Sequence, residues 1–169
     1  MNGKTLQVAA AIVGIVIGVA AVWFLGLNAI IPALSVGVAW WILTRLGVHR
    51  RLRLPLAFTG GHGLWFLVGM VMTLAIGGSV DSIVELVLET LVIAAIVAWV
   101  YATRSKPSLH VLIAYEAVSI LFNATTFMGV DDQLRMVIAV HVGLRIVAIV
   151  GAVLALNHRA EYAEQPPPS

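Results

Sequence analysis

The sequence predicts an all-α fold: a polytopic integral membrane bundle of about six transmembrane helices with both termini in the cytoplasm. Of the 169 residues, 61% are hydrophobic and only 11% are charged. A soluble domain carries about 25% charged residues. The charges that are present fall almost entirely between long apolar stretches. Lipid is therefore the expected surroundings of nearly the whole chain.

Six apolar runs have the length of about 17–25 residues that an α-helix needs to cross a bilayer. They are residues 6–25, 29–46, 56–76, 80–101, 109–127 and 134–156. A membrane-spanning β-barrel would instead show segments of about ten residues with alternating polarity. We expect one transmembrane domain over residues 1–156, followed by a short disordered cytoplasmic tail over residues 157–169, which is rich in proline near its end.

The first two runs differ in length and in their small residues. Residues 6–25 exceed the apolar core of a signal peptide, so we expect them to stay as a helix. Within this run Ala10, Gly14 and Gly18 lie four residues apart and predict a face for close helix packing, either within the molecule or in a homo-oligomer. Residues 29–46 are short for a span and carry Pro32, which a helix tolerates in its first turn.

Lysine and arginine in the links predict the orientation. Short cytoplasmic links carry an excess of these residues. The basic residues between or after the runs are Arg45, Arg50, Arg51, Arg53, Arg104, Lys106 and Arg159. The other links are uncharged or contain Asp131 and Asp132 with one Arg135. We therefore expect the basic links and both termini in the cytoplasm of a cell membrane, where the arginines contact anionic lipid headgroups rather than nucleic acid.

The third and fourth runs contain unusual polar residues. In the third, Gly60-Gly61-His62-Gly63 lacks the strand and helix context of a nucleotide loop and indicates only a weak start to the helix. In the fourth, Asp81, Glu85 and Glu89 repeat every four residues along one face. Asp81 and Glu85 are expected to form an acidic stripe at the outer end of the helix, where its N-terminal dipole favours negative charge. Glu89 lies about 12 Å further along, close to the middle of the membrane.

The fifth and sixth runs each have a charged residue near their midpoint. Glu116 and Arg145 reach similar depths because the two helices are joined by a short link and must be antiparallel neighbours. We expect them to pair, with Glu89 as the other candidate partner of Arg145. Ser119 and Asn123 continue the face of Glu116, and His141 lies one turn before Arg145 on the facing helix; hydrogen bonds between these three side chains are expected across the hairpin.

The functional prediction rests on the buried carboxylates, which outnumber the buried cations. Each charged residue at the centre of a helix costs about 2.5–3.5 kcal/mol on insertion scales. The excess acid must be protonated, bind a cation or contact water. The interpretation that we favour is a small proton- or cation-linked transporter or channel component with Glu89, Glu116, His141 and Arg145 in its interior. The Glu116–Arg145 pair could instead be a purely structural clasp.

Two other classes of protein remain open from the sequence. One is a non-catalytic subunit or assembly factor of a larger membrane complex, whose partners are the lipid bilayer and other chains. The other is a subunit that holds b-type haem between His62 and His110. The chain has no cysteine, which excludes disulfides, thiolate metal sites and cysteine nucleophiles. We expect no enzymatic activity, no metal, no cofactor and no nucleic-acid partner.

Overall fold

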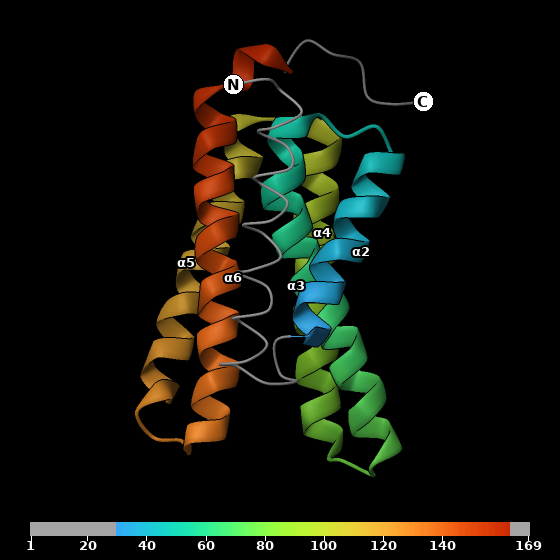
Figure 1. The fold of residues 1–169 in the computed structure, drawn as a ribbon, viewed down its shortest axis with the longest axis vertical. Coiled ribbons are helices and arrows are strands. Elements are labelled where there is room, and N and C mark those ends of the chain that lie inside the picture. The colour runs from blue at the N-terminus through green and yellow to red at the C-terminus, as the bar shows by residue number, and fades with distance from the viewer. Residues whose placement is uncertain (1–29, 163–169) are drawn as a thin grey trace, which may run out of the picture.

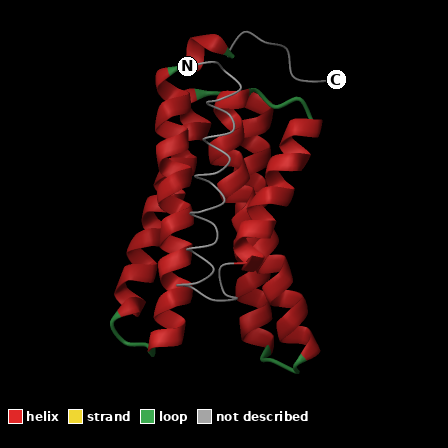
Figure 2. Ribbon diagram, in the orientation of Figure 1, coloured by secondary structure: helices red, strands yellow, loops and turns green. Residues whose placement is uncertain are grey.

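A computed structural model describes residues 30–162, and within that range every regular element is a helix (Figures 1 and 2). The elements are α2 (Ile30–Arg45), α3 (Arg50–Ala75), α4 (Val80–Thr103), α5 (Lys106–Phe127), α6 (Asp132–Asn157) and the short 3₁₀-helix η2 (Arg159–Glu161). The first predicted helix, with Ala10, Gly14 and Gly18, lies outside the described residues.

Four of these helices are long and apolar enough to cross a membrane. They are α3, α4, α5 and the Leu134–Asn157 part of α6. The fifth, α2, is also apolar but has only 16 residues. The described part of the chain is therefore all-helical and has the character of a membrane protein, as the sequence predicts.

Helix α3 is the centre of the arrangement. It packs against α2, α4 and α6, whereas α5 packs mainly on α6 and has few contacts with α4. The helices form two groups, α2–α3–α4 and α5–α6, which stand side by side in Figure 1. The α3–α6 interface is therefore the main connection between the groups.

Small residues let α3 and α6 approach closely. Ala148, Ala152 and Ala155 of α6 are fully buried. A Cβ atom placed on Gly151 would lie 2.9 Å from both the Cδ atom and the backbone nitrogen of Pro55 in α3. Because lipid supplies no hydrophobic drive for helix association, such close backbone packing is a main source of attraction between the two groups.

Helix α3 begins six residues before the apolar run that predicted it. His49 is its N-cap and accepts a hydrogen bond from the backbone N–H of Arg51 at 3.3 Å. Arg50, Arg51 and Arg53 therefore lie in the helix rather than in a link, and Pro55 lies inside it rather than at its start. An apolar run marks only the part of a helix that meets lipid, whereas the helix itself continues into the polar interface.

The remaining helix ends follow capping chemistry that the sequence contains. Ser79, Ser105 and Asp131 each accept a hydrogen bond from the backbone N–H three residues later, at the starts of α4, α5 and α6. Gly77, in the turn between α3 and α4, has a φ of +71°, which glycine adopts without steric cost. Arg104 ends α4 with a φ of 47°, in the left-handed region common at helix C-termini.

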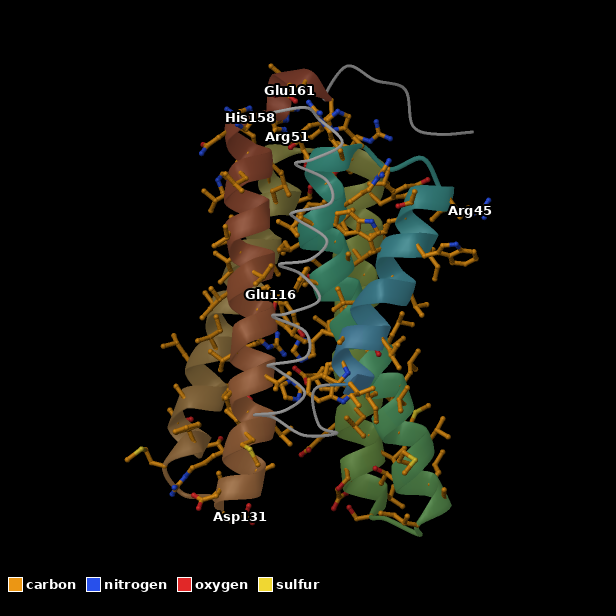
Figure 3. All side chains as sticks on the ribbon, viewed as in Figure 1. Arg45, Arg51, Glu116, Asp131, His158 and Glu161 are labelled. Atoms are coloured by element: carbon orange, nitrogen blue, oxygen red, sulfur yellow. The ribbon has the colours of Figure 1, made fainter. Side chains whose placement is uncertain are left out.

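The two ends of the bundle differ in charge. The links α2–α3 and α4–α5 and residues 158–162 lie at one end, which we call the basic end. The links α3–α4 and α5–α6 lie at the opposite end, which we call the acidic end. Figure 3 shows Arg45, Arg51 and Glu161 at the basic end and Asp131 at the acidic end. The links whose charge alternates along the sequence therefore lie at opposite ends of the bundle.

The first residues after α6 are folded, whereas the sequence led us to expect disorder from residue 157. Tyr162 is fully buried, and its hydroxyl donates a hydrogen bond to the carbonyl of Ala155 at 2.8 Å. Glu161 lies 3.2 Å from Arg51 Nη2 and 3.0 Å from His158 Nδ1. Two contacts hold this segment in place: the burial of the Tyr162 ring and the ion pair between the Glu161 carboxylate and Arg51 of α3. Residues 163–169 of the expected tail lie outside the described part.

Candidate functional site

Glu116 and Arg145 form an ion pair in the interior. Figure 3 shows Glu116 about midway between the two ends of the bundle. The Nη1 atom of Arg145 donates to Oε2 of Glu116 at 2.8 Å, and the hydroxyl of Thr59 donates to Oε1 at 2.6 Å. Glu116 is 1% exposed and Arg145 is 2% exposed. Both carboxylate oxygens therefore have a donor, and α3, α5 and α6 meet at one carboxyl group. The structure therefore contains the contact between Glu116 and Arg145 that their similar depths in neighbouring helices predict.

Glu89 of α4 is a second carboxylate on the same guanidinium. Its Oε1 atom lies 3.6 Å from Nη2 of Arg145 and accepts a hydrogen bond of 3.4 Å from the Tyr115 hydroxyl. The Arg145 guanidinium also lies over the ring of Tyr115, 5.4 Å from its centroid. The side chain of Glu89 is 45% exposed, unlike that of Glu116. Arg145 thus connects a buried carboxylate to an accessible one. Both of its candidate partners, Glu116 and Glu89, contact the guanidinium.

A cleft between α4 and α5 gives access to Glu89. Its volume is about 530 Å³. The residues that line it are Glu85, Leu88, Glu89, Val118, Ser119, Phe122 and Asn123. Two carboxylates and two neutral polar side chains thus face one opening. Of the expected acidic stripe, Glu85 and Glu89 line the cleft, whereas Asp81 lies exposed in the first turn of α4.

The prediction of hydrogen bonds between Ser119, Asn123 and His141 is wrong. The amide of Asn123 donates to the backbone carbonyl of Ser119 in its own helix at 2.8 Å. The ring of His141 faces His62 of α3 instead. His141 of α6 faces α3 rather than α5, and Ser119 of α5 lines the cleft with α4.

His62 and His141 form a second polar contact in the interior. Nε2 of His62 and Nδ1 of His141 face each other as hydrogen-bond partners. The Trp65 ring stacks on His141 with a centroid separation of 4.0 Å, and the Phe66 ring lies 5.0 Å from that of His62. His62 thus faces His141, whereas His110 lies exposed on α5 near the basic end.

Sequence reasoning missed Thr59, Tyr115 and the histidine pair as parts of the site. One signal was available: Thr59 and His62 are three residues apart and share a face of an otherwise apolar helix. The spacing of residues within one helix does not show which neighbouring helix the face of Thr59 and His62 contacts. Among the described residues, no cluster of three or more His, Asp or Glu side chains is arranged to hold a metal ion.

The charge in this network does not balance. Glu89 and Glu116 contribute two negative charges when ionised, and Arg145 contributes one positive charge, which leaves one negative charge. The Nε atom of Arg145 is buried and has no hydrogen-bond partner among the described residues. The network therefore has room for one more positive charge and holds one N–H without an acceptor.

Fold and site together define a helical membrane protein with a charged, partly accessible interior. Comparisons of the chain with protein-family models, with curated proteins and with solved structures found no match. The functional argument therefore rests on the geometry of this site.

Proposed function

We propose that this chain is a small proton- or cation-linked membrane transport protein whose ion binds at Glu89. The observation that supports this proposal is the double contact of Arg145 with a fully buried carboxylate and with an accessible one. Glu116 is tied to Arg145 at 2.8 Å and to Thr59 at 2.6 Å. Glu89 is held more loosely, at 3.6 Å, at the edge of a cleft. Glu89 is therefore the carboxylate that can exchange its partner.

Binding at Glu89 changes the contact between α4 and α6. When Glu89 takes up a proton or a cation, its attraction to Arg145 falls, and the guanidinium remains with Glu116. Release of the ion restores the contact. An ion arriving in the cleft is thereby linked to the packing of two helices that belong to different groups, which is the kind of coupling that a transport cycle requires.

The lining of the cleft favours a cation over an anion or an apolar solute. Glu85 and Glu89 supply negative charge, and Ser119 and Asn123 supply neutral polar groups. A cleft of one charge sign with apolar walls raises the local concentration of ions of the opposite sign. The oxygen atoms of these side chains are ligands that hard monovalent and divalent cations accept.

A structural role of the pair in a non-catalytic subunit is the second candidate. Both oxygens of Glu116 are hydrogen bonded in a site without exposure, as expected for a clasp that fixes helix packing. The accessible Glu89 is what favours transport, because a clasp needs no opening.

For the topology, we propose six spans, with the basic end and both termini in the cytoplasm of a cell membrane. The positive-inside bias supports this orientation, and the cleft would then open toward the outside. Cysteines introduced at the exposed positions Ile76 and Met128, at the acidic end, should react with an impermeant thiol reagent added to intact cells. A cysteine at Lys106, at the basic end, should not. Reaction at Lys106 alone would reverse the orientation.

The function is tested by ion flux into vesicles that contain the purified protein. Glu89→Gln should abolish flux driven by a proton or cation gradient, since the amide keeps the shape of a protonated acid but cannot release a proton. Asp81→Asn, in the exposed first turn of the same helix and outside the cleft, is the matched control and should retain flux. Equal flux in the wild type and Glu89→Gln would contradict the proposal. Absence of flux in the wild type, with a stable partner protein co-purifying, would favour the accessory subunit.

A further inference from the structure

The histidine pair joins the two helix groups but has no part in the function proposed above. His62 belongs to α3 and His141 to α6, and their facing ring nitrogens are Nε2 and Nδ1. His62 is 1% exposed, so its ring has almost no contact with the surroundings of the protein. An imidazole is the side chain whose ordinary pKa lies closest to physiological pH. Two of them in contact inside a membrane bundle therefore call for a chemical role.

A contact between two imidazole nitrogens requires exactly one proton between them. A neutral imidazole has one N–H, which donates, and one bare nitrogen, which accepts. Two bare nitrogens would repel, and two N–H groups would leave both without an acceptor. The facing nitrogens of His62 and His141 must therefore share a single proton whenever both rings are neutral.

Such a pair can pass a proton from one side to the other. A proton that arrives at Nδ1 of His62 makes this ring an imidazolium, which then gives its Nε2 proton to Nδ1 of His141. His141 in turn releases the proton on its Nε2 atom. One proton enters, one leaves, and both rings are neutral again with the hydrogen bond reversed. Proton transfer in the opposite direction restores the first state.

The aromatic surroundings suit a cation that remains on the two rings. The Trp65 ring is stacked 4.0 Å from the His141 ring, and the Phe66 ring lies 5.0 Å from the His62 ring. The faces of such rings attract a cation, by about 0.5–2 kcal/mol per contact. Zn²⁺ is almost always bound by four ligands, and among the described residues no group of three or more His, Asp or Glu side chains is placed to hold a metal ion.

The charges on the neighbouring helices leave room for one proton. Glu89 on α4, Tyr115 and Glu116 on α5 and Arg145 on α6 are the titratable or charged groups of the interior network. On α2, which also packs against α3, the charged residue is Arg45 at the basic end. The two carboxylates exceed the guanidinium by one negative charge, so one proton on the histidine pair brings the interior to neutrality. Arg145, one turn from His141, repels a proton on either ring, and the two carboxylates offset this repulsion.

We propose that His62 and His141 form one shared proton-binding site in the transport path, and that the transported ion is therefore the proton. This inference rests on the proposed function and identifies its ion. Glu89 then exchanges protons with the cleft, and the histidine pair carries them within the bundle.

Proton flux in vesicles tests this inference with three single variants. His62→Gln and His141→Gln each remove the relay and should lower pH-driven flux about tenfold or more, since groups that transfer protons contribute factors of about 100 or more. His110→Gln changes an exposed histidine of α5 and should leave flux at the wild-type rate. Flux abolished by Glu89→Gln but unchanged in both His62→Gln and His141→Gln would overturn the inference and leave the proposed function standing. A wild-type protein without flux would overturn the proposed function itself.

A measurement on the wild-type protein covers the case in which the histidine variants do not fold. Nitrogen NMR of histidine-labelled protein should show a coupling across one N–H···N bond between two imidazoles, and uptake of one proton by that pair when the sample is acidified. The signal should persist in His110→Gln. Two histidines without a coupling would overturn the inference, and so would stoichiometric zinc or copper that co-purifies with the wild type and broadens or shifts these signals.

Discussion

Two arginine–glutamate contacts in this molecule have the same chemistry and opposite surroundings. Arg145 and Glu116 meet at 2.8 Å in the middle of the bundle, where their side chains are 2% and 1% exposed. Arg51 and Glu161 meet at 3.2 Å at the basic end, where their side chains are 32% and 36% exposed. The first contact joins α5 to α6, and the second joins the start of α3 to η2.

The surroundings decide what each contact can do. Charges removed from water pay a large desolvation cost, so loss of one partner in a buried pair leaves a charge that nothing compensates. An exposed pair is already solvated and screened, and its loss has little effect. The interior pair therefore constrains which helices lie next to each other, whereas the pair at the basic end holds a terminal segment reversibly.

The largest expected effect comes from breaking the interior pair. Arg145→Ala should lower stability by about 3–5 kcal/mol, because Glu116 is left buried without its cation. Glu116→Gln in the same chain should restore part of the loss, since the amide carries no charge. Thermal unfolding in detergent measures both. Simple addition of the two single losses would show that the residues do not interact, and rescue by Glu89→Gln instead would make Glu89 the main partner.

Removal of one hydrogen bond to Glu116 should have the next largest effect. Thr59→Val keeps the volume but takes away the donor to Oε1, and hydrogen bonds to charged groups contribute about 1.5–3 kcal/mol. Thr90→Val is the matched control, because the Thr90 hydroxyl bonds to the Leu86 carbonyl of its own helix. Equal melting temperatures of the two variants would show that Thr59 does not support Glu116.

The close contact between α3 and α6 should give a smaller effect that can be tested with two glycines of one helix. An alanine in place of glycine normally favours a helix by about 1 kcal/mol. Gly143→Ala should show that gain, because a Cβ atom there meets no neighbour within 4 Å. Gly151→Ala should instead lower the melting temperature, because its Cβ atom meets Pro55. A gain at both positions would show that the helices are further apart than described.

The smallest effect is expected at the basic end, and it should depend on pH. The hydrogen bond from Arg51 lowers the pKa of Glu161, and burial lowers the pKa of His49, the N-cap of α3. For both groups the unfolded state binds protons more readily than the folded one. Their contribution is therefore present above the unfolded pKa values and is lost as the pH falls through the lowered folded values.

Acidification should accordingly loosen residues 158–162 before it affects the interior. The protection of the Tyr162 backbone amide against hydrogen exchange, taken relative to its intrinsic exchange rate at each pH, should fall below the ordinary pKa of a histidine and fall further below that of a carboxyl group. Glu161→Gln should remove the second of these changes and leave the first. A protection that is independent of pH would show that neither group holds the segment.

The sequence predicts how deep a side chain lies in the bundle better than it predicts which neighbouring helix the side chain faces. Apolar runs gave the helices α2 to α6, and the positions of Glu116 and Arg145 within theirs gave the level at which they meet. The start of α3 was missed because arginines at a membrane surface do not end a helix. The partners of His141 and Ser119 were missed because the depth of a side chain does not fix which neighbouring helix it faces: His141 faces α3, and Ser119 lines the cleft with α4.

The position of Arg145 in α6, the last α-helix of the described residues, has a consequence for synthesis of the protein. A ribosome produces Glu89 on α4 and Glu116 on α5 before it produces this arginine, so both acids enter the insertion machinery while their shared guanidinium does not yet exist. We expect the nascent chain to remain beside the translocon, or bound to a membrane chaperone, until α6 arrives. A chain truncated before α6 should be degraded by membrane quality control, and Glu116→Gln should prolong its lifetime in a pulse–chase experiment.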